Sequence, residues 1–311
     1  MKQSVYKRFK EYDESHCWQY EMRRQNLEED LKSAGLSQED ANSLRASDFE
    51  FNYIPKDDKE KCKDIKEFIE RHEWLGKMPI WLTHRFTASH RPTGSLAGVI
   101  IMATPNTFSN LLGAENRNLE KLIARGACIS WAPKNLGSWL ITKSIRWMVK
   151  NTEFRYFTAY SDPEAKELGT IYQACNFTYL GQTFGAAKQY LDPENEERGW
   201  FGENGFADRS VIVRYAKQLG IEWQKEWYKM VGKKKNYRKV DWSKMPEDVS
   251  ARIKQLRKEH KQRCLVRTSP PKHKYCYILG KTIAETKGLK RKFAELNPDK
   301  LNLNYPSIRG K

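Results

Sequence analysis

Two stretches of the sequence carry polar side chains where an apolar, strand-like run gives way to a helical pattern. The first is the loop WAPKNLGSWL, residues 131–140, which contains Lys134, Asn135, Gly137 and Ser138. A helix N-terminus directs backbone N–H groups and the positive end of its dipole at one point, which suits a pyrophosphate or a carboxylate. We therefore take these four residues as a candidate cofactor-binding set. An ordinary turn capped by Asn135 or Ser138 accounts for the loop equally well.

The second stretch is AYSDPEAKELGTIYQACNFTYLG, residues 159–181, in which Asp162 ends an expected strand and Tyr172 lies on the following helix. A carboxylate and a phenol are groups that general acid–base catalysis uses. Taken singly, Asp162 could merely cap a turn and Tyr172 could pack in the core. Their joint spacing with the first loop makes them candidates for a site.

The elements that must position these side chains alternate between strand and helix. Strand patterns cover residues 80–89, 95–106, 122–130, 154–162 and 178–184, and helical patterns cover residues 63–76, 138–151 and 169–177. This alternation predicts an α/β core over residues 61–190, with helices packed on the faces of a sheet.

Three further segments surround the predicted core. Residues 1–60 are expected to form an N-terminal helical arm, in which Ser37 is the N-cap of the second helix. Residues 191–230 are expected to form a helical connector, and IEWQKEWYKMV is predicted to be one of its helices. Residues 231–311 are expected to form a basic extension with one helix, the short strand KYCYILG and a Pro-containing tail.

Positive charge is concentrated in the last segment. Residues 231–311 contain 23 Lys and Arg against 7 Asp and Glu, so +16 of the net charge of +17 falls there. A field of one sign attracts polyanions, and aromatic residues such as Tyr237 and Trp242 interleave with the basic ones, which favours nucleic acid. A solubilising tail and an anionic-membrane contact are the alternatives. The residues expected to contact DNA are Lys233, Lys234, Lys235, Arg238, Lys239, Lys272, His273 and Lys274.

Other features bear on location and metal content. No apolar run approaches the ~20 residues that span a bilayer, and the first residues lack the apolar core of a secretion signal, so we expect a cytoplasmic protein without membrane contact. The six Cys are widely spaced and are expected to be free thiols. His72, His84 and His90 show no metal-ligand spacing, so no metal is expected.

From the first loop to residue 181 the sequence resembles the GNAT acyltransferase superfamily. Tyr172 lies where that superfamily often keeps the Tyr that protonates the departing thiolate of coenzyme A. The loop is similar to the signature Arg/Gln-x-x-Gly-x-Gly/Ala but reads Lys134-x-x-Gly137-x-Trp139, and Trp139 would crowd the pyrophosphate position. The resemblance implies a GNAT-like mixed central sheet flanked by helices. An acyl-coenzyme A-like molecule is one candidate for the group donor, and the sequence does not identify the donor.

A closer resemblance is to the Mom family of phage proteins, which add a carbamoylmethyl group to adenine in DNA and so protect it from restriction. Four stretches carry it in order: SLAGVIIMATPN, RGACISWAPKNLGSWL, AYSDPEAKELGTIYQACNFTYLG and KHKYCYILG. They cover roughly residues 65–190 and 265–285. The residues that the family pattern implicates in catalysis are Asp162, Tyr172, Ser138, Arg125, His72 and Glu73.

The resemblance implies roles for these residues. Asp162 would be a base or an orienting carboxylate, Tyr172 an acid and Arg125 an anion clamp, and the loop 131–140 would hold a cofactor or a substrate carboxylate. The target amine of adenine lies inside the duplex, so the base would have to leave the stack.

We therefore expect a transferase that modifies the exocyclic amine of adenine in double-stranded DNA. One alternative is an acetyl-coenzyme A-dependent transferase that acts on a protein or a small amine. Another is a non-catalytic DNA-binding phage protein. A nuclease is disfavoured because no Asp/Glu pair with a Lys is arranged for metal-dependent hydrolysis. The oligomeric state is open.

Overall fold

The computed structural model describes residues 17–183, 188–231 and 237–306, and it forms two compact units. The core unit combines Tyr12–Phe184 with Pro270–Lys311. The second unit, Gly185–Ser269, is inserted between these two parts of the core and is called the inserted unit below. Each unit is described by itself.

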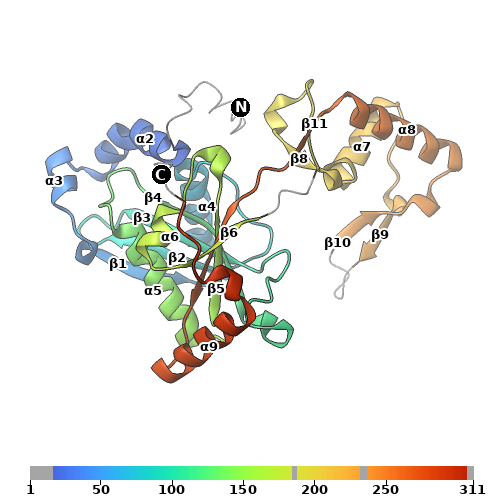
Figure 1. Cartoon of the computed structure of the whole chain (residues 1–311). Coiled ribbons are helices and arrows are strands. Elements are labelled where there is room, and N and C mark those ends of the chain that lie inside the picture. Colours follow the sequence, from blue (N-terminus) through green and yellow to red (C-terminus); the bar gives the residue numbers. More distant parts are fainter. Residues whose placement is uncertain (1–16, 184–187, 232–236, 307–311) are drawn as a thin grey trace. The chain divides into compact units, whose positions relative to one another are not determined.

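The core unit is built on one mixed sheet of seven strands (Figure 1). Every neighbouring pair is antiparallel except β4 and β5, which are parallel. In sheet order the strands are β1 (Phe49–Ile54), β2 (Leu82–His90), β3 (Leu96–Ala103), β4 (Glu120–Cys128), β5 (Tyr156–Ser161), β12 (His273–Ile278) and β6 (Thr178–Gln182).

Strands β4 and β5 separate part of the way along their length. Their pairing runs from Glu120 opposite Tyr156 to Ile123 opposite Ala159. The remainder of β4 pairs with β3, and β5 continues to pair with β12 as far as Ser161. Beyond Ile123 and Ala159 the two parallel strands are not paired with each other, and this unpaired end between them is called the opening below.

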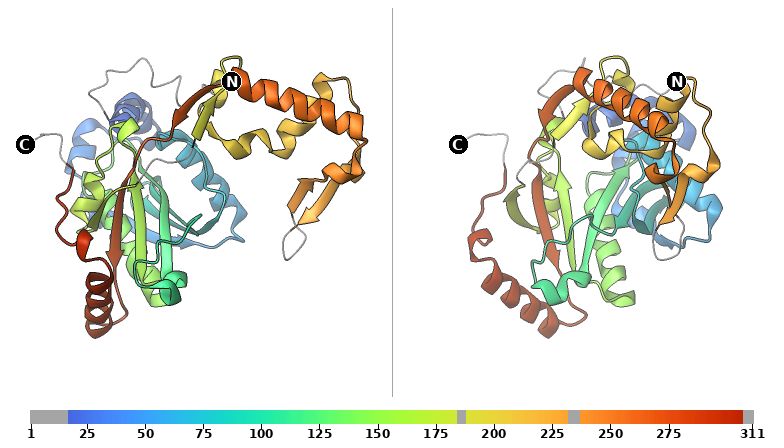
Figure 2. Two further views of the ribbon diagram at one scale, coloured as in Figure 1. Left: turned by 45° about the vertical axis from the view of Figure 1, so that its right-hand side comes forward. Right: turned by 90° about the vertical axis from the view of Figure 1, so that its right-hand side faces the viewer.

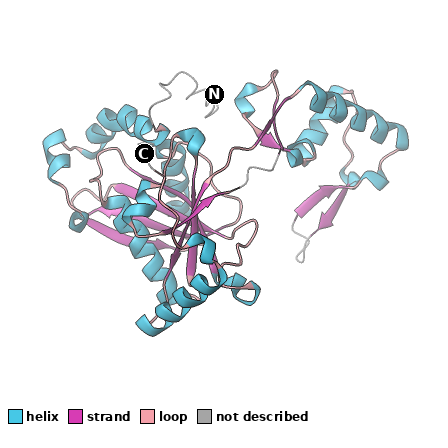
Figure 3. Ribbon diagram, viewed as in Figure 1, coloured by secondary structure: helices cyan, strands magenta, loops and turns pink. Residues whose placement is uncertain are grey.

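Helices cover the sheet (Figure 3). The helices α4 (Lys59–His72) and α5 (Leu136–Asn151) both pack against β3 and β4. The apolar face predicted for α5 is correct, because Leu140, Ile141 and Met148 are buried. The other core helices are α2 (Trp18–Ala34), α3 (Gln38–Ser43), α6 (Thr170–Ala174) and α9 (Ile283–Leu296).

The middle of the sheet shows why these elements pack as they do. The run LAGVIIMA of β3 is buried at every position except the first, so both faces of this strand are covered. Each fully buried Val, Leu, Ile or Met side chain contributes roughly 1.5–3 kcal/mol relative to an exposed one. The sequence-based prediction of an α/β core with a mixed sheet flanked by helices is confirmed.

The inserted unit has its own small core. Three strands form one sheet, two more form a hairpin, and α7 packs against α8. The elements are β7 (Lys188–Leu191), β8 (Phe201–Gly202), α7 (Arg209–Gln218), β9 (Tyr228–Val231), β10 (Tyr237–Val240), α8 (Glu247–Arg263) and β11 (Leu265–Thr268). Their core is centred on Ile212, Tyr215, Trp227 and Ile253.

Short 3-10 helices connect the longer elements. Those of the core unit are η1 (Ala46–Asp48), η2 (Ala114–Leu119), η3 (Pro163–Ala165) and η8 (Pro298–Lys300). Those of the inserted unit are η4 (Glu196–Arg198), η5 (Glu203–Phe206), η6 (Lys225–Trp227) and η7 (Trp242–Lys244). In the described part of the chain, no helix is long and apolar enough to cross a membrane.

The structure departs from several sequence-based expectations. The segment FEFNYI of the expected helical arm is β1, an edge strand whose partner, β2, lies about thirty residues further along the chain. The expected helix in IEWQKEWYKMV is wrong, because this stretch forms η6 and β9. Strand β12 lies between β5 and β6 and α9 packs on β12, so the last part of the expected extension belongs to the core unit (Figure 2).

Candidate active site

Asp162 lies directly after β5, at the opening beside β4. Its Oδ1 accepts a hydrogen bond from the backbone N–H of Glu164 at 3.1 Å, so it caps η3. Its Oδ2 lies 2.9 Å from Nζ of Lys272. The register explains this ion pair, because Ser161 on β5 pairs with His273 on β12 and their neighbours therefore face each other. Lys272, which the sequence analysis predicts to contact DNA, forms an ion pair with Asp162.

Glu73 follows α4 and is buried. Its Oε2 accepts the N–H of Gly76 at 2.8 Å, and its Oε1 lies 3.8 Å from Nε of Arg125 on β4. Burial raises the pKa of Glu73 to about 7, although Arg125 and Lys272 both act to lower it.

Arg125 is held in place by backbone carbonyls. Its Nε donates to the carbonyl of Lys77 at 2.8 Å and its Nη1 to that of Ala124 at 2.5 Å. These contacts position the guanidinium beside Glu73. They favour a role in orienting that carboxyl group over the free anion clamp expected from the sequence.

Glu167 is a site residue that the sequence analysis did not find. The left-handed Lys166, with φ of 58°, turns the chain after η3, and Oε2 of Glu167 accepts the N–H of Asp162 at 3.3 Å. Burial raises the pKa of Glu167 to about 7, and the neighbouring Glu73 and Asp162 also raise it. An acidic residue in AKELG looks like a solvated charge, so no spacing signal in the sequence would have found it.

Tyr172 lies on α6, beside this acidic group. Its ring centroid is 5.2 Å from that of Tyr275 and 5.3 Å from that of Phe177. Burial raises the pKa of Tyr172 well above its usual range, and the nearby Glu167 raises it further. The phenol therefore stays protonated at neutral pH, and its raised pKa makes it a weaker acid than a free tyrosine.

The loop before α5 forms part of a second feature. Asn135 and Ser138 line an open cavity of about 250 Å³, whose other lining residues are Trp139, Thr142, Lys143, Arg146 and Ala174. The Ser138 hydroxyl donates to the carbonyl of Asn135 at 3.0 Å. The basic groups of Lys143 and Arg146 suit an anionic ligand.

Two of the four predicted cofactor-binding residues do not line this cavity. Lys134 is exposed outside it. Gly137 is buried, and a Cβ there would lie 2.8 Å from Cδ1 of Ile171. The close approach that Gly137 permits is thus between α5 and α6.

Helix α6 connects the cavity with the acidic group. Ala174 lines the cavity, Ile171 contacts the first turn of α5, and Tyr172 is next to Glu167. The short helix α6 therefore contributes Ala174 to the cavity and Tyr172 to the acidic group.

His72 does not join the group around Glu167. It is buried, with Nδ1 3.6 Å from Oδ2 of Asp30 and its ring 4.4 Å from that of Phe68. Burial lowers the pKa of His72 to about 4, so the imidazole is neutral at physiological pH. These contacts fit a packing role at the end of α4, because the ring faces Asp30 and Phe68.

The other residues that were predicted to contact DNA have different surroundings. Lys233, Lys234 and Lys235 lie outside the described residues, while Arg238 and the exposed Lys239 are on β10. His273 is buried and hydrogen-bonded to the Tyr179 hydroxyl at 2.8 Å, so its expected contact with DNA is not supported. Lys274 lies over the ring of Tyr160.

Together these groups can perform proton transfer. Glu73 and Glu167 have pKa values of about 7, so either can accept a proton near neutral pH, while Tyr172 can donate one. The Asp162–Lys272 ion pair and Arg125 hold the carboxyl groups in place. The structure thus combines a mixed α/β core with acid and base groups beside the point where β4 and β5 stop pairing.

Part of the chain matches a known protein family. Residues 48–199 match the model of the Mom protein family. The matched range contains the core strands from β1 to β6, both candidate loops and all the residues that the sequence analysis implicated in catalysis. No curated protein matches the chain.

Solved structures of acetyltransferases show distant likenesses to the chain. The ribosomal-protein-S5-alanine acetyltransferase from Vibrio fischeri has 12% identity and a TM-score of 0.33, covering 44% of this chain and 82% of that one. NAA60 from Arabidopsis thaliana, solved with a bisubstrate analogue, has 12% identity and a TM-score of 0.30, covering 46% and 87%. A tandem GNAT protein from the clavulanic acid pathway has 12% identity and a TM-score of 0.31, covering 47% and 49%.

Proposed function

We propose that this protein is a DNA-modifying transferase that joins a small acyl-derived group, of the carbamoylmethyl type, to the exocyclic amine of adenine. The match of residues 48–199 to the Mom family model and the mixed α/β fold support an acyl-transfer or DNA-modification role. The observation that carries the proposal is the convergence of Glu73, Asp162 and Tyr172 with Glu167 inside the matched region.

The arrangement suggests which groups accept and which donate a proton. As the new bond forms to the adenine nitrogen, that nitrogen loses a proton, which the carboxylate of Glu167 or Glu73 accepts. The leaving group of the donor takes a proton from the Tyr172 hydroxyl. The amine is a weak nucleophile because its lone pair is delocalised, so tight positioning must supply much of the rate. Asp162, Lys272 and Arg125 hold the reacting groups in place.

The donor would bind in the cavity beside α5. Ser138 and Asn135 offer polar contacts there, and Lys143 and Arg146 offer positive charge, which together fit an anionic group. Trp139 forms one wall of this cavity, with its ring edge against Phe51. A bulky side chain at this position favours a donor that differs from acyl-coenzyme A in how its phosphates lie.

DNA is the acceptor in this proposal. The basic residues of the inserted unit and of α9 would contact the phosphate backbone, and these contacts would offset the few kcal/mol needed to unstack the target base. Modified adenine would then resist restriction enzymes. We place the reaction in the cytoplasm, where the DNA of a phage and of its host is found.

Nucleoside mass spectrometry tests the proposal directly. Plasmid DNA from cells that express the full chain should contain a new deoxyadenosine adduct, and the adduct should be lost with Tyr172→Phe. Tyr20→Phe is the matched control, because Tyr20 is exposed on α2 and should tolerate loss of its hydroxyl. An adduct that persists in Tyr172→Phe would remove this residue from the proposed mechanism.

Two other experimental results would each favour a different function. DNA that stays unmodified while the purified chain binds it tightly would favour a non-catalytic DNA-binding protein. Binding to immobilised coenzyme A together with acetylation of a protein or small amine would favour an N-acetyltransferase.

A further inference from the structure

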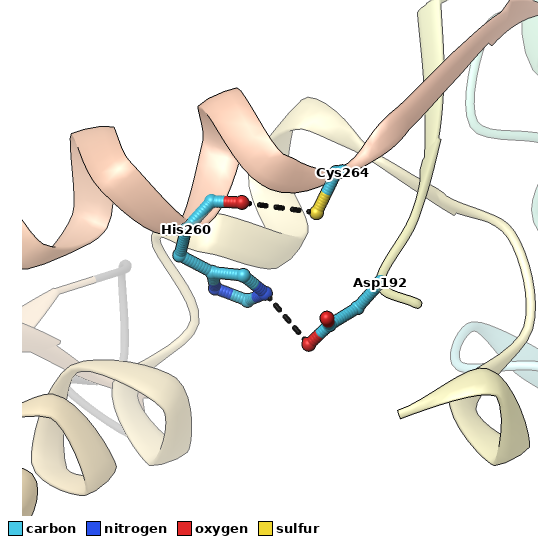
Figure 4. Close-up of side chains that lie close together, drawn as sticks. All are labelled: Asp192, His260 and Cys264. Atoms are coloured by element: carbon cyan, nitrogen blue, oxygen red, sulfur yellow. Dashed lines mark hydrogen bonds and ion pairs between the residues drawn. The ribbon is translucent and has the colours of Figure 1, made fainter. Parts of the chain in front are cut away.

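The inserted unit holds a buried group of three residues whose side chains are all of metal-ligating types. Asp192, His260 and Cys264 each offer one ligand atom, and these atoms all lie within 4.8 Å of one another (Figure 4). All three residues are buried, with 5%, 2% and 6% of their surface exposed. Among the described residues this is the one such group that the structure brings together.

The fold explains why these residues meet. His260 and Cys264 are four residues apart at the end of α8, so they lie on one face of the helix. Leu191 on β7 pairs with Leu265 on β11, and this register places Asp192, just after β7, beside Cys264, just before β11. The three ligands therefore come from two segments separated by almost seventy residues, a relation that sequence spacing does not reveal.

The surrounding contacts resemble the outer shell of a metal site. The Tyr215 hydroxyl on α7 forms a hydrogen bond with Nδ1 of His260, which directs Nε2 towards Oδ2 of Asp192 at 2.9 Å. The other oxygen of Asp192 accepts the N–H of Glu194 at 3.1 Å and lies 3.6 Å from Nε of Arg263. Second-shell bonds of this kind fix the orientation and tautomer of a ligating imidazole.

We propose that Asp192, His260 and Cys264 bind a zinc-class transition-metal ion that holds the inserted unit together. Imidazole nitrogen, thiolate sulfur and carboxylate oxygen are the donors that Zn²⁺ takes, with the fourth tetrahedral position left to water or another small ligand. The charges of the Asp192 carboxylate and the Cys264 thiolate would balance those of the ion, while Arg263 pairs with Glu194 at 3.0 Å.

Metal binding removes one proton from Cys264 and changes the tautomer of His260. The Cys264 thiol now donates to the carbonyl of His260, and it would release its proton to become a thiolate. The imidazole of His260 would carry its proton on Nδ1, where the Tyr215 oxygen accepts it, and Nε2 would coordinate the ion in place of its bond to Asp192.

A structural ion suits this part of the chain. The inserted unit is a small domain, in which a single hydrophobic core supplies little stability and a metal often compensates. The ion would join β7, α8 and β11 at one point and tie α7 to them through Tyr215. This inference does not rest on the proposed transferase function.

Metal analysis of the full-length chain tests the inference. The protein, purified without chelators, should hold stoichiometric zinc by plasma mass spectrometry. After exchange with Co²⁺ it should show a near-ultraviolet thiolate-to-cobalt charge-transfer band. Cys264→Ser should lose the band, whereas Cys62→Ser on α4, which also removes a free thiol, should keep it. Tyr215→Phe should keep the fold and weaken cobalt affinity about tenfold or more.

Two results would overturn the proposed metal site. If the purified chain neither contains zinc nor gives a thiolate–cobalt band, the proposal is overturned, and the cluster is a Tyr215–His260–Asp192 hydrogen-bond chain. Equal metal content in Cys264→Ser and the unchanged protein would place any bound metal elsewhere and would also overturn it. Far-ultraviolet circular dichroism confirms that each variant is folded.

Discussion

At the scale of single residues, the candidate site depends on carboxyl groups placed in different surroundings. Asp162 faces the ammonium group of Lys272 at 2.9 Å, and Glu73 lies 3.8 Å from the Arg125 guanidinium. Glu167 receives hydrogen bonds from the N–H of Asp162 and from Trp74. Burial raises the pKa of both Glu73 and Glu167 to about 7, which gives the site two groups that change charge near neutral pH.

The raised pKa of Glu167 has a consequence for stability. Its folded pKa of about 7 exceeds the unfolded value of about 4.3, so between these pH values the native state binds more protons. Stability should therefore fall as pH rises through this window. Glu167→Gln removes this contribution, so the variant should gain roughly 1–3 kcal/mol relative to the unchanged protein between pH 4.5 and pH 8.

Denaturant unfolding at several pH values measures this difference. Glu28→Gln, at an exposed position on α2, is the control. Its unfolding free energy should differ from that of the unchanged protein by nearly the same amount at every pH. A constant difference between Glu167→Gln and the unchanged protein across the range would show that Glu167 titrates normally.

At the scale of elements, the turn between η3 and α6 aligns the site. Lys166 and Gly169 both adopt left-handed conformations, with φ of 58° and 66°, where η3 ends and where α6 begins. The Tyr275 hydroxyl donates to the carbonyl of Leu168 at 2.5 Å, which fixes this turn against β12. The turn thus sets the positions of Glu167 and Tyr172 together.

Gly169→Ala should disturb this alignment. A Cβ at Gly169 would lie 2.5 Å from the Tyr275 ring, and the ring packs against Tyr172. We expect a loss of roughly 2–4 kcal/mol in unfolding free energy, from backbone strain and overpacking, together with a strong loss of DNA modification.

Gly35→Ala is the matched control for backbone strain alone. Gly35 has a similar φ of 64° but no atom within 4 Å of its Cβ position. It should cost roughly 1–2 kcal/mol and leave modification intact. An equal loss of unfolding free energy in the two variants would show that the contact between the new Cβ and the Tyr275 ring adds no cost of its own.

At the scale of the whole molecule, the basic sequence is divided between the two units. Residues 231–269 of the inserted unit contain 13 basic and 4 acidic residues, and residues 270–311 of the core unit contain 10 and 3. Both regions could attract a phosphate backbone, so the charge pattern alone does not distinguish them.

Salt titration of DNA binding distinguishes the two regions. Replacing Lys233, Lys234, Lys235, Arg238 and Lys239 with Gln should reduce the slope of log affinity against log salt by about 4.5 if all five contact phosphates. Replacing Lys287, Lys290 and Arg291 on α9 provides the comparison, because these side chains are exposed on the core unit. A reduced slope in the α9 variant alone would place the DNA contact on the core unit.

Much of the core unit followed from local pattern. The apolar run of β3, the buried face of α5 and the Ser37 cap of α3 were predicted because burial periodicity and capping depend on residues close together in the chain. The sequence patterns also placed Asp162 at the end of a strand and Tyr172 on the next α-helix, as the structure has them. Features of this kind are determined by residues that are close together in the sequence.

Tertiary structure decided the rest, because the relevant contacts join distant residues. Strand β12 enters the sheet after the inserted unit, and its register pairs Lys272 with Asp162. Chain reversal at Lys166 brings Glu167 to Asp162, and the pairing of β7 with β11 brings Asp192 to Cys264. Strand register and burial are set by long-range packing, so neither these partners nor the raised pKa of Glu167 could be inferred from spacing along the chain.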